Sequence, residues 1–237
     1  MPKKLTEAQV AQFRAEGYVY PFRAVSAGEA AEYRKRIEAY ETEQAIDANR
    51  TLKIKGNLAF PWLMDIARNQ NVLDAVEDLI GPDIMLWISR ILYKPPVKGR
   101  EVPWHQDGHY WPIRPLATCT VWVALEPSTR ANGCLRVIPG SHTGKYLHPH
   151  LHEDRNDLTL NQRMAEGTFD ESQAADLELQ PGEMSMHDIY MIHGAKAGDH
   201  ILAPGWTPYQ YRLLVDAHDV TNHLVEGENA FGVLLTD

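Results

Sequence analysis

The pattern of the chain changes at Gly81-Pro82, and this change limits the folds open to it. Before it lie helix signals, namely capping boxes at Thr6–Gln9 and Ser26–Glu29 and a helical run over Val72–Ile80 that the Gly-Pro pair ends. After it come short runs rich in β-branched and aromatic residues, separated by turn residues. Helices first and many short strands afterwards indicate an α+β domain.

The strand-like runs are numerous and short, as in a jelly-roll barrel. We expect strands over 84–93, 118–125, 134–138, 183–187, 192–195, 209–216 and 231–235. A polar stretch near 148–175 lacks clear periodicity, and we expect it to be a loop insertion, or short helices, over the mouth of the barrel. The chain is predicted to be one domain over 1–237. Residues 1–82 are expected to be mainly helical and packed on one sheet, and 83–237 to form the jelly roll.

Composition excludes several classes of function. The formal net charge is −9, and no basic block stands out, which argues against nucleic acid or a membrane surface as the main partner. Two cysteines give no disulfide framework and suit a reducing compartment. We find no signal-peptide core and no apolar run long enough to span a membrane, so the expectation is a soluble, cytoplasmic protein.

An imidazole and a carboxylate stand two residues apart at His105 and Asp107. On a strand, residues i and i+2 point to the same face, so these two side chains can converge on one metal ion. A third ligand is available at His193. Two histidines and one carboxylate, with coordination positions left open, form the facial triad of non-haem Fe(II) oxygenases. The sequence therefore predicts an iron centre.

Each of these residues also has an ordinary explanation. Eleven histidines make a chance His-x-Asp triplet easy to find, and His193 could be a buried histidine bonded to a backbone carbonyl. A histidine-rich stretch over 148–153 could bind zinc or nickel, but it lies in a polar loop, where surface histidines are the simpler explanation. His187 could contribute a ligand; we favour a supporting or packing role, because the triad already has two histidines.

Arg212 lies in an otherwise apolar run, where a buried arginine is costly unless a carboxylate meets it. One explanation is an internal salt bridge, with Asp216 or with a glutamate elsewhere. The other is an anchor for the distal carboxylate of a dicarboxylic cosubstrate, since the guanidinium fork binds carboxylates in bidentate fashion. In an Fe(II) oxygenase that cosubstrate would be 2-oxoglutarate.

Several segments together resemble the phytanoyl-CoA dioxygenase family. They are Tyr93-Lys94-Pro95-Pro96, Trp104-His105-Gln106-Asp107-Gly108-His109-Tyr110, Asn132-Gly133-Cys134-Leu135, Ile138-Pro139-Gly140-Ser141-His142, Pro181-Gly182-Glu183 and His193-Gly194. The resemblance covers most of the chain. It implies a double-stranded β-helix, Fe(II), and 2-oxoglutarate as cosubstrate.

By position, the resemblance implies the roles of individual residues. The iron ligands would be His105, Asp107 and His193. The 2-oxoglutarate site would be lined by Gln106, Trp122 and Arg212, together with Lys53 or Lys55, of which we prefer Lys53. Ala195 stands where family members often have serine, so one hydrogen bond to the cosubstrate would be lost or supplied elsewhere.

The expected reaction is hydroxylation of an aliphatic C–H of a small molecule by O₂, with release of succinate and CO₂ and with ascorbate as a reductant. Halogenation is disfavoured, because Asp107 fills the position that a halide would need. The alternatives are a non-catalytic barrel and an O₂-independent zinc or manganese cupin-like protein. Cationic side chains could bind an anionic substrate group, although charged surface is the simpler explanation for them: Arg90, Lys94, Arg100 and Arg114. The substrate, its attachment to CoA and the oligomeric state stay open.

Overall fold

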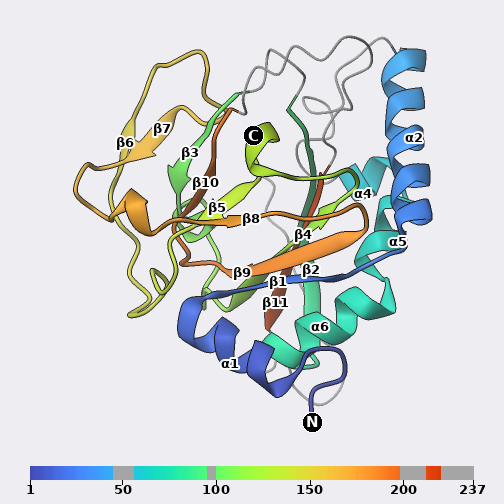
Figure 1. The fold of residues 1–237 in the computed structure, drawn as a ribbon, viewed down its shortest axis with the longest axis horizontal. Helices are drawn as coiled ribbons and strands as arrows, with labels where there is room; N and C mark the ends of the chain where they lie inside the picture. Colours follow the sequence, from blue (N-terminus) through green and yellow to red (C-terminus); the bar gives the residue numbers. More distant parts are fainter. Residues whose placement is uncertain (45–55, 95–99, 198–211, 220–237) are drawn as a thin grey trace.

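A computed structural model of the chain describes residues 1–44, 56–94 and 100–197, and the backbone of 212–219. Two antiparallel sheets face each other, and helices cover the outer face of the larger one (Figure 1). This is the predicted α+β jelly roll with helices on one sheet.

The described helices are α1 (Glu7–Glu16), α2 (Ala27–Gln44), α4 (Gly56–Ala59), α5 (Leu63–Ala67) and α6 (Gln70–Ile80). Three of them, α1, α2 and α6, lie where the sequence signals stand, whereas α4 and α5 had no signal. Both capping boxes form: Thr6 and Gln9 bond reciprocally, as do Ser26 and Glu29. Gly17 ends α1 at φ 82°, a left-handed conformation that glycine adopts without steric cost.

The order of the strands in each sheet is not their order in the chain. The larger sheet runs β1 (Tyr18–Arg23), β9 (Glu183–Asp188), β4 (Thr118–Ala124), β11 (Arg212–Asp219), β2 (Ile84–Leu92). The smaller one runs β3 (Val102–His105), β10 (His193–Ala195), β5 (Leu135–Val137), β8 (Ala175–Leu177). Residues distant in sequence therefore lie on neighbouring strands.

Three parts of the fold differ from the expectation. One is β8, which pairs with β5 although no strand was expected over 175–177. The 148–175 stretch contains a hairpin, β6 (His150–His152) with β7 (Gln162–Met164), as well as irregular chain and one 3₁₀ turn. We had no signal for β1, which pairs with β9 and lies against α1. Its short polar and aromatic run carries no clear alternation. Residues 209–211 and the predicted strand over 231–235 lie outside the described residues.

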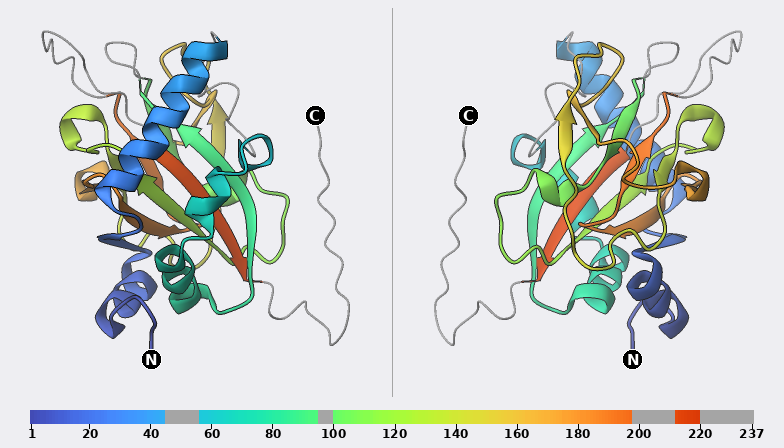
Figure 2. Two further views of the ribbon diagram at one scale, coloured as in Figure 1. Left: turned by 90° about the vertical axis from the view of Figure 1, so that its right-hand side faces the viewer. Right: turned by 90° about the vertical axis from the view of Figure 1, so that its left-hand side faces the viewer.

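The central strand β4 separates two hydrophobic layers, and all seven of its residues are buried. Cys119, Val121 and Val123 pack beneath the helices, whereas Trp122 and Ala124 pack toward the smaller sheet. Both faces of a covered strand are buried, so the run reads as continuously apolar. Figure 2 shows α2, α5 and α6 on one side of the larger sheet, with the β6–β7 hairpin on the other.

Candidate metal centre

Three side chains converge between the two sheets. His105 ends β3, His193 begins β10, and the two residues are direct partners in the antiparallel register, with ring centroids 4.2 Å apart. Asp107 Oδ1 lies 3.6 Å from His105 Nε2 and 3.8 Å from His193 Nε2. One ligand atom from each residue lies within 4.8 Å of the others, so a single ion can contact all three.

The two histidine rings are held with the same nitrogen free. His105 Nδ1 lies 2.8 Å from the Pro103 carbonyl and His193 Nδ1 lies 3.0 Å from the Met191 carbonyl. A carbonyl only accepts, so each Nδ1 carries the proton and donates it. Each Nε2 then keeps the lone pair that a metal requires, and this pairing fixes the tautomer and the ring orientation.

Local backbone geometry explains how His105 and Asp107 share a side. The prediction assumed one continuous strand, but β3 ends at His105 and Asp107 begins a 3₁₀ turn, η1 (Asp107–His109). Gln106 between them is still extended, at φ −124° and ψ 126°, so the two-residue alternation carries through to Asp107. The chain turns only after the second ligand has been placed.

Gly194 permits the close approach of β10 and β3. A Cβ at this position would lie 2.9 Å from the Val102 carbonyl and 3.3 Å from Trp104. Only a residue without a side chain fits there, so the strand can bring His193 opposite His105.

The second oxygen of Asp107 is held from the larger sheet. Thr120 Oγ1 donates to Asp107 Oδ2 at 3.1 Å, and His187 Nε2 lies 3.6 Å from the same oxygen. Thr120 and His187 are both fully buried. This leaves Oδ1 on the side of the two histidines of the cluster, with His187 beside Oδ2.

Burial and neighbouring charges favour the protonation states that a metal binds. Burial lowers the pKa of His193 well below its usual value, with His105 adding to the effect, so its imidazole is neutral. Burial alone would raise the pKa of Asp107, but His193, His105 and His187 outweigh it and hold this pKa well below its usual value. An ionised Asp107 carboxylate and a neutral His193 imidazole fit a divalent transition metal such as Fe(II).

The three residues open onto a cavity between the sheets. Its remaining walls come from β2, β3, β4, β5, β9 and β10 and from the 148–175 insertion: Arg90, Leu92, Tyr93, Lys94, Val102, Trp122, Leu135, Thr159, Leu160, His187 and Ala195. Thr159 and Leu160 show that the insertion contributes to the cavity wall. Trp122 lines the cavity, and so does Ala195, which has no hydroxyl.

Gln106 lies elsewhere than predicted. Its side-chain amide donates to the carbonyls of Tyr146 and Tyr190, at 2.9 and 2.7 Å, and its oxygen accepts from the His148 amide at 2.8 Å. The residue is fully buried and does not line the cavity. Because Gln106 alternates with both ligands, its side chain points to the opposite side of the chain. This geometry does not support contact between Gln106 and 2-oxoglutarate.

The structure describes little of the remaining residues that were predicted to contact the cosubstrate. Lys53 and Lys55 lie outside the described residues. For Arg212 the backbone alone is described, and it pairs with Leu92 of β2 and Ala124 of β4.

The rival histidines are dispersed. His150 stacks on His109 with centroids 4.0 Å apart, whereas His152 pairs with Asp154 at the surface. Burial, with a contribution from His109, lowers the pKa of His150 to about 4. In the described part of the chain, the triad is the one cluster of at least three histidine, cysteine or acidic side chains with metal-binding geometry.

Two functional candidates were misjudged from sequence. Arg90 and Lys94 were assigned to the charged surface, but both line the cavity, whereas Arg100 and Arg114 are exposed. The position of Arg90 was the more readable of the two. Alternation along β2 was the available signal: Ile91 packs beneath the helices, which places Arg90 on the opposite, inward face.

Across the described residues, we find no helix that combines the length and the apolar character required to cross a membrane.

Comparison with known proteins agrees with this architecture. The chain is 34% identical over 145 residues to "Probable phytanoyl-CoA dioxygenase" of Caenorhabditis elegans, covering 58% of this chain and 46% of that one. It is 26% identical over 140 residues to "Probable alpha-ketoglutarate-dependent hypophosphite dioxygenase" of Stutzerimonas stutzeri, covering 59% and 49%. The chain thus spans about half the length of these relatives.

A solved structure described as the non-heme monooxygenase ThoJ in its apo form superposes with a TM-score of 0.74 at 26% identity, covering 89% of this chain and 76% of that one. A family model for the alpha-L-rhamnosidase N-terminal domain matches only residues 179–237. The model of phytanoyl-CoA dioxygenase (PhyH) matches residues 13–200, most of the chain and both halves of the site. The chain belongs to the phytanoyl-CoA dioxygenase family.

Proposed function

We propose that the protein is an Fe(II)- and 2-oxoglutarate-dependent dioxygenase that hydroxylates an aliphatic C–H of a small molecule. The observation that carries this proposal is the convergence of His105, Asp107 and His193, with both Nε2 atoms and one carboxylate oxygen facing a common point. Two histidines and one carboxylate suit iron that must still accept other ligands.

The iron, when bound, supplies O₂ activation coupled to decarboxylation of 2-oxoglutarate. The overall reaction balances as R–H, O₂ and 2-oxoglutarate giving R–OH, succinate and CO₂. The protein's part is to fix the ligands, orient the cosubstrate and exclude water. The two histidines hold their tautomers through backbone carbonyls, and Thr120 orients the Asp107 carboxylate.

For the cosubstrate we propose Arg212 as the anchor of the distal carboxylate, with Trp122 as a wall and Lys53 as a further contact. Two observations support this assignment. Trp122 lines the cavity beside the triad, and the backbone of Arg212 pairs with that of Leu92, itself a cavity residue. Both relatives named above are described as dioxygenases, and the name of one states that it depends on α-ketoglutarate, which agrees with 2-oxoglutarate as the cosubstrate. Ascorbate is proposed as an auxiliary reductant.

The test is turnover of 2-oxoglutarate by the iron-loaded protein. We expect the wild type to form succinate in an Fe(II)- and O₂-dependent manner, and Asp107→Ala to reduce this to background because one of three ligands is missing. Asp154→Ala is the matched control, since that carboxylate is 85% exposed at the surface. Undiminished succinate formation by Asp107→Ala would overturn the assignment.

The same assay separates the alternatives. A strict Zn²⁺ requirement without O₂ uptake would indicate the O₂-independent cupin-like protein. Absence of turnover with any metal would indicate the non-catalytic barrel. Product analysis in chloride-containing buffer tests halogenation. Because the Asp107 carboxylate fills the position that a halide would need, we expect hydroxylated and not chlorinated product.

A further inference from the structure

Arg90 is a cation of the cavity without a partner in the described structure. It lies on β2 two residues before Leu92, and both side chains line the cavity with the triad. Its Nε is buried, and among the described residues no acceptor lies within hydrogen-bond distance of it. A buried guanidinium donor left unsatisfied is costly, and planar carboxylates match its fork.

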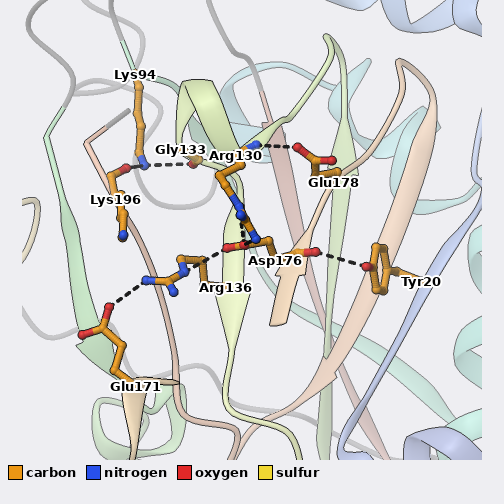
Figure 3. A network of polar contacts seen from close by, with 9 residues as sticks. All are labelled: Tyr20, Lys94, Arg130, Gly133, Arg136, Glu171, Asp176, Glu178 and Lys196. Atoms are coloured by element: carbon orange, nitrogen blue, oxygen red, sulfur yellow. Dashed lines mark hydrogen bonds and ion pairs between the residues drawn. The ribbon is translucent and has the colours of Figure 1, made fainter. Parts of the chain in front are cut away.

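Three other cationic groups of this region have hydrogen-bond partners (Figure 3). Arg136 bonds Asp176 and Glu171, and Arg130 bonds Asp176. Lys94, the other cation of the cavity wall, donates to the backbone carbonyls of Gly133 and Lys196. Arg90 differs from all three, because no acceptor of the described chain lies within hydrogen-bond distance of its Nε.

The charges of the cavity also leave Arg90 unbalanced. Asp107 is the one acidic side chain among the described lining residues, and the proposed metal would consume it. The formal charges sum to zero when a divalent metal and Arg212, the proposed anchor, are counted with Asp107 and dianionic 2-oxoglutarate. The positive charges of Arg90 and Lys94 then remain on the cavity wall for a further anion. Lys94 already donates to backbone carbonyls, whereas the Arg90 Nε has no acceptor among the described residues.

Tyr110 shows that Arg90 and the metal site share one electrostatic environment. Burial raises the pKa of the Tyr110 phenol, the charge of Asp107 adds to the rise, and the charge of Arg90 opposes it. The Tyr110 ring in turn packs edge-on against the His105 ring, with centroids 5.9 Å apart. A molecule held by Arg90 would therefore lie next to the proposed reacting centre.

We propose that Arg90 binds the carboxylate of the substrate, which is a small aliphatic acid whose chain lies against apolar cavity residues such as Leu92, Val102 and Leu135. This proposal rests on the proposed function, which identifies the neighbouring site as the iron and 2-oxoglutarate site. It assigns Arg90 a specificity-determining role, distinct from the cosubstrate anchor.

The experiment compares two probes of equal length, hexanoate and hexanamide, by ligand-observed NMR relaxation with and without saturating 2-oxoglutarate. We expect the wild type to bind hexanoate at least about tenfold more tightly, as a charged bidentate pair would give. Arg90→Gln should remove this preference and leave hexanamide binding unchanged, and Arg90→Lys should keep part of it. Arg100→Gln, an equal charge change at an exposed arginine, is the control and should behave as wild type.

Two results would overturn the proposal. One is equal binding of the two probes by the wild type, including no binding of either. The other is displacement of hexanoate by 2-oxoglutarate together with a raised Kd for 2-oxoglutarate in Arg90→Gln, which would make Arg90 a cosubstrate residue. Cosubstrate binding is read separately, from the charge-transfer band of the anaerobic Fe(II) protein. If that band never forms in the wild type, the proposed function fails while the probe comparison still tests Arg90.

Discussion

At the scale of single residues, the two oxygens of Asp107 have different partners. Oδ1 lies toward His105 and His193, the proposed histidine ligands, whereas Oδ2 accepts from Thr120 and lies beside His187. A carboxylate held by one oxygen presents the other in a fixed direction, which reduces the ordering required when a metal binds. Thr120 therefore acts as a positioning residue.

Thr120→Val should weaken metal binding by roughly 10- to 100-fold, the usual effect of losing a hydrogen bond to a ligand. Titration with Co²⁺ against a competing chelator measures this, and saturating metal should restore turnover. Thr118→Val is the matched control on the same face of β4, because its buried hydroxyl has no hydrogen-bond partner among the described residues. Equal affinity in Thr120→Val and wild type would show that Oδ2 needs no support.

Gln106 is a second positioning residue, and it acts on the chain around the site. Gln106→Glu keeps the shape but cannot donate to the Tyr146 and Tyr190 carbonyls. We expect the free energy of unfolding to fall by about 2–4 kcal/mol, because two carbonyl acceptors lose their donor and a charge is placed at a fully buried side chain. Urea unfolding measures this, with exposed Gln44→Glu as the control. A loss below about 0.5 kcal/mol would contradict the role.

At the scale of elements, α2 is tied to the larger sheet by one ion pair. Arg34 of α2 contacts Glu126, which follows β4 and is only 3% exposed. Burial raises the pKa of Glu126 from 4.5 to about 7, although Arg34 partly opposes the shift. Folded protein then holds a proton on Glu126 that the unfolded chain has already released.

This pKa shift gives a signed pH dependence. The contribution of Glu126 to stability is fully present below about pH 4.5 and is lost as the pH rises through about 7. Glu126→Gln should remove that decline, which urea midpoints measured across the window would show as a flatter profile. Glu38→Gln is the control, because Glu38 pairs with the same arginine at the exposed side of α2. An unchanged slope in Glu126→Gln would mean that the folded protein keeps this carboxyl ionised throughout.

At the scale of the whole molecule, the metal centre lies where the two sheets meet. His105 and His193 belong to the smaller sheet, whereas Thr120 and His187 belong to the larger. The helices share one hydrophobic cluster with the larger sheet. We therefore expect the chain to behave as one domain.

Unfolding followed by circular dichroism and by tryptophan fluorescence should give coincident single transitions. Metal at about 100 times its Kd should raise the free energy of unfolding of the whole chain by about 2.7 kcal/mol, since the metal binds only the folded state. Asp107→Ala should lose this shift and keep the single transition. Two separate transitions, or a shift in one probe alone, would contradict a single domain.

The predictable parts of the fold and site rest on local rules. The capping boxes of α1 and α2, the end of α6 before Pro82 and the apolar run of β4 were all readable, because each depends on a few adjacent residues. The β6–β7 hairpin and β1 were not, because each is defined by the strand it pairs with.

The sequence by itself determined the chemistry of the proposed ligands. It supplied two imidazoles and one carboxylate, and the extended backbone at Gln106 placed two of them on one side. Only the tertiary structure decided which groups surround them. The contact of Thr120 with Asp107, the turn of Gln106 toward the Tyr146 carbonyl and the place of Arg90 in the cavity join residues far apart in the chain. Alternation along a strand gives a side chain its face, but the packing of two sheets decides what that face meets.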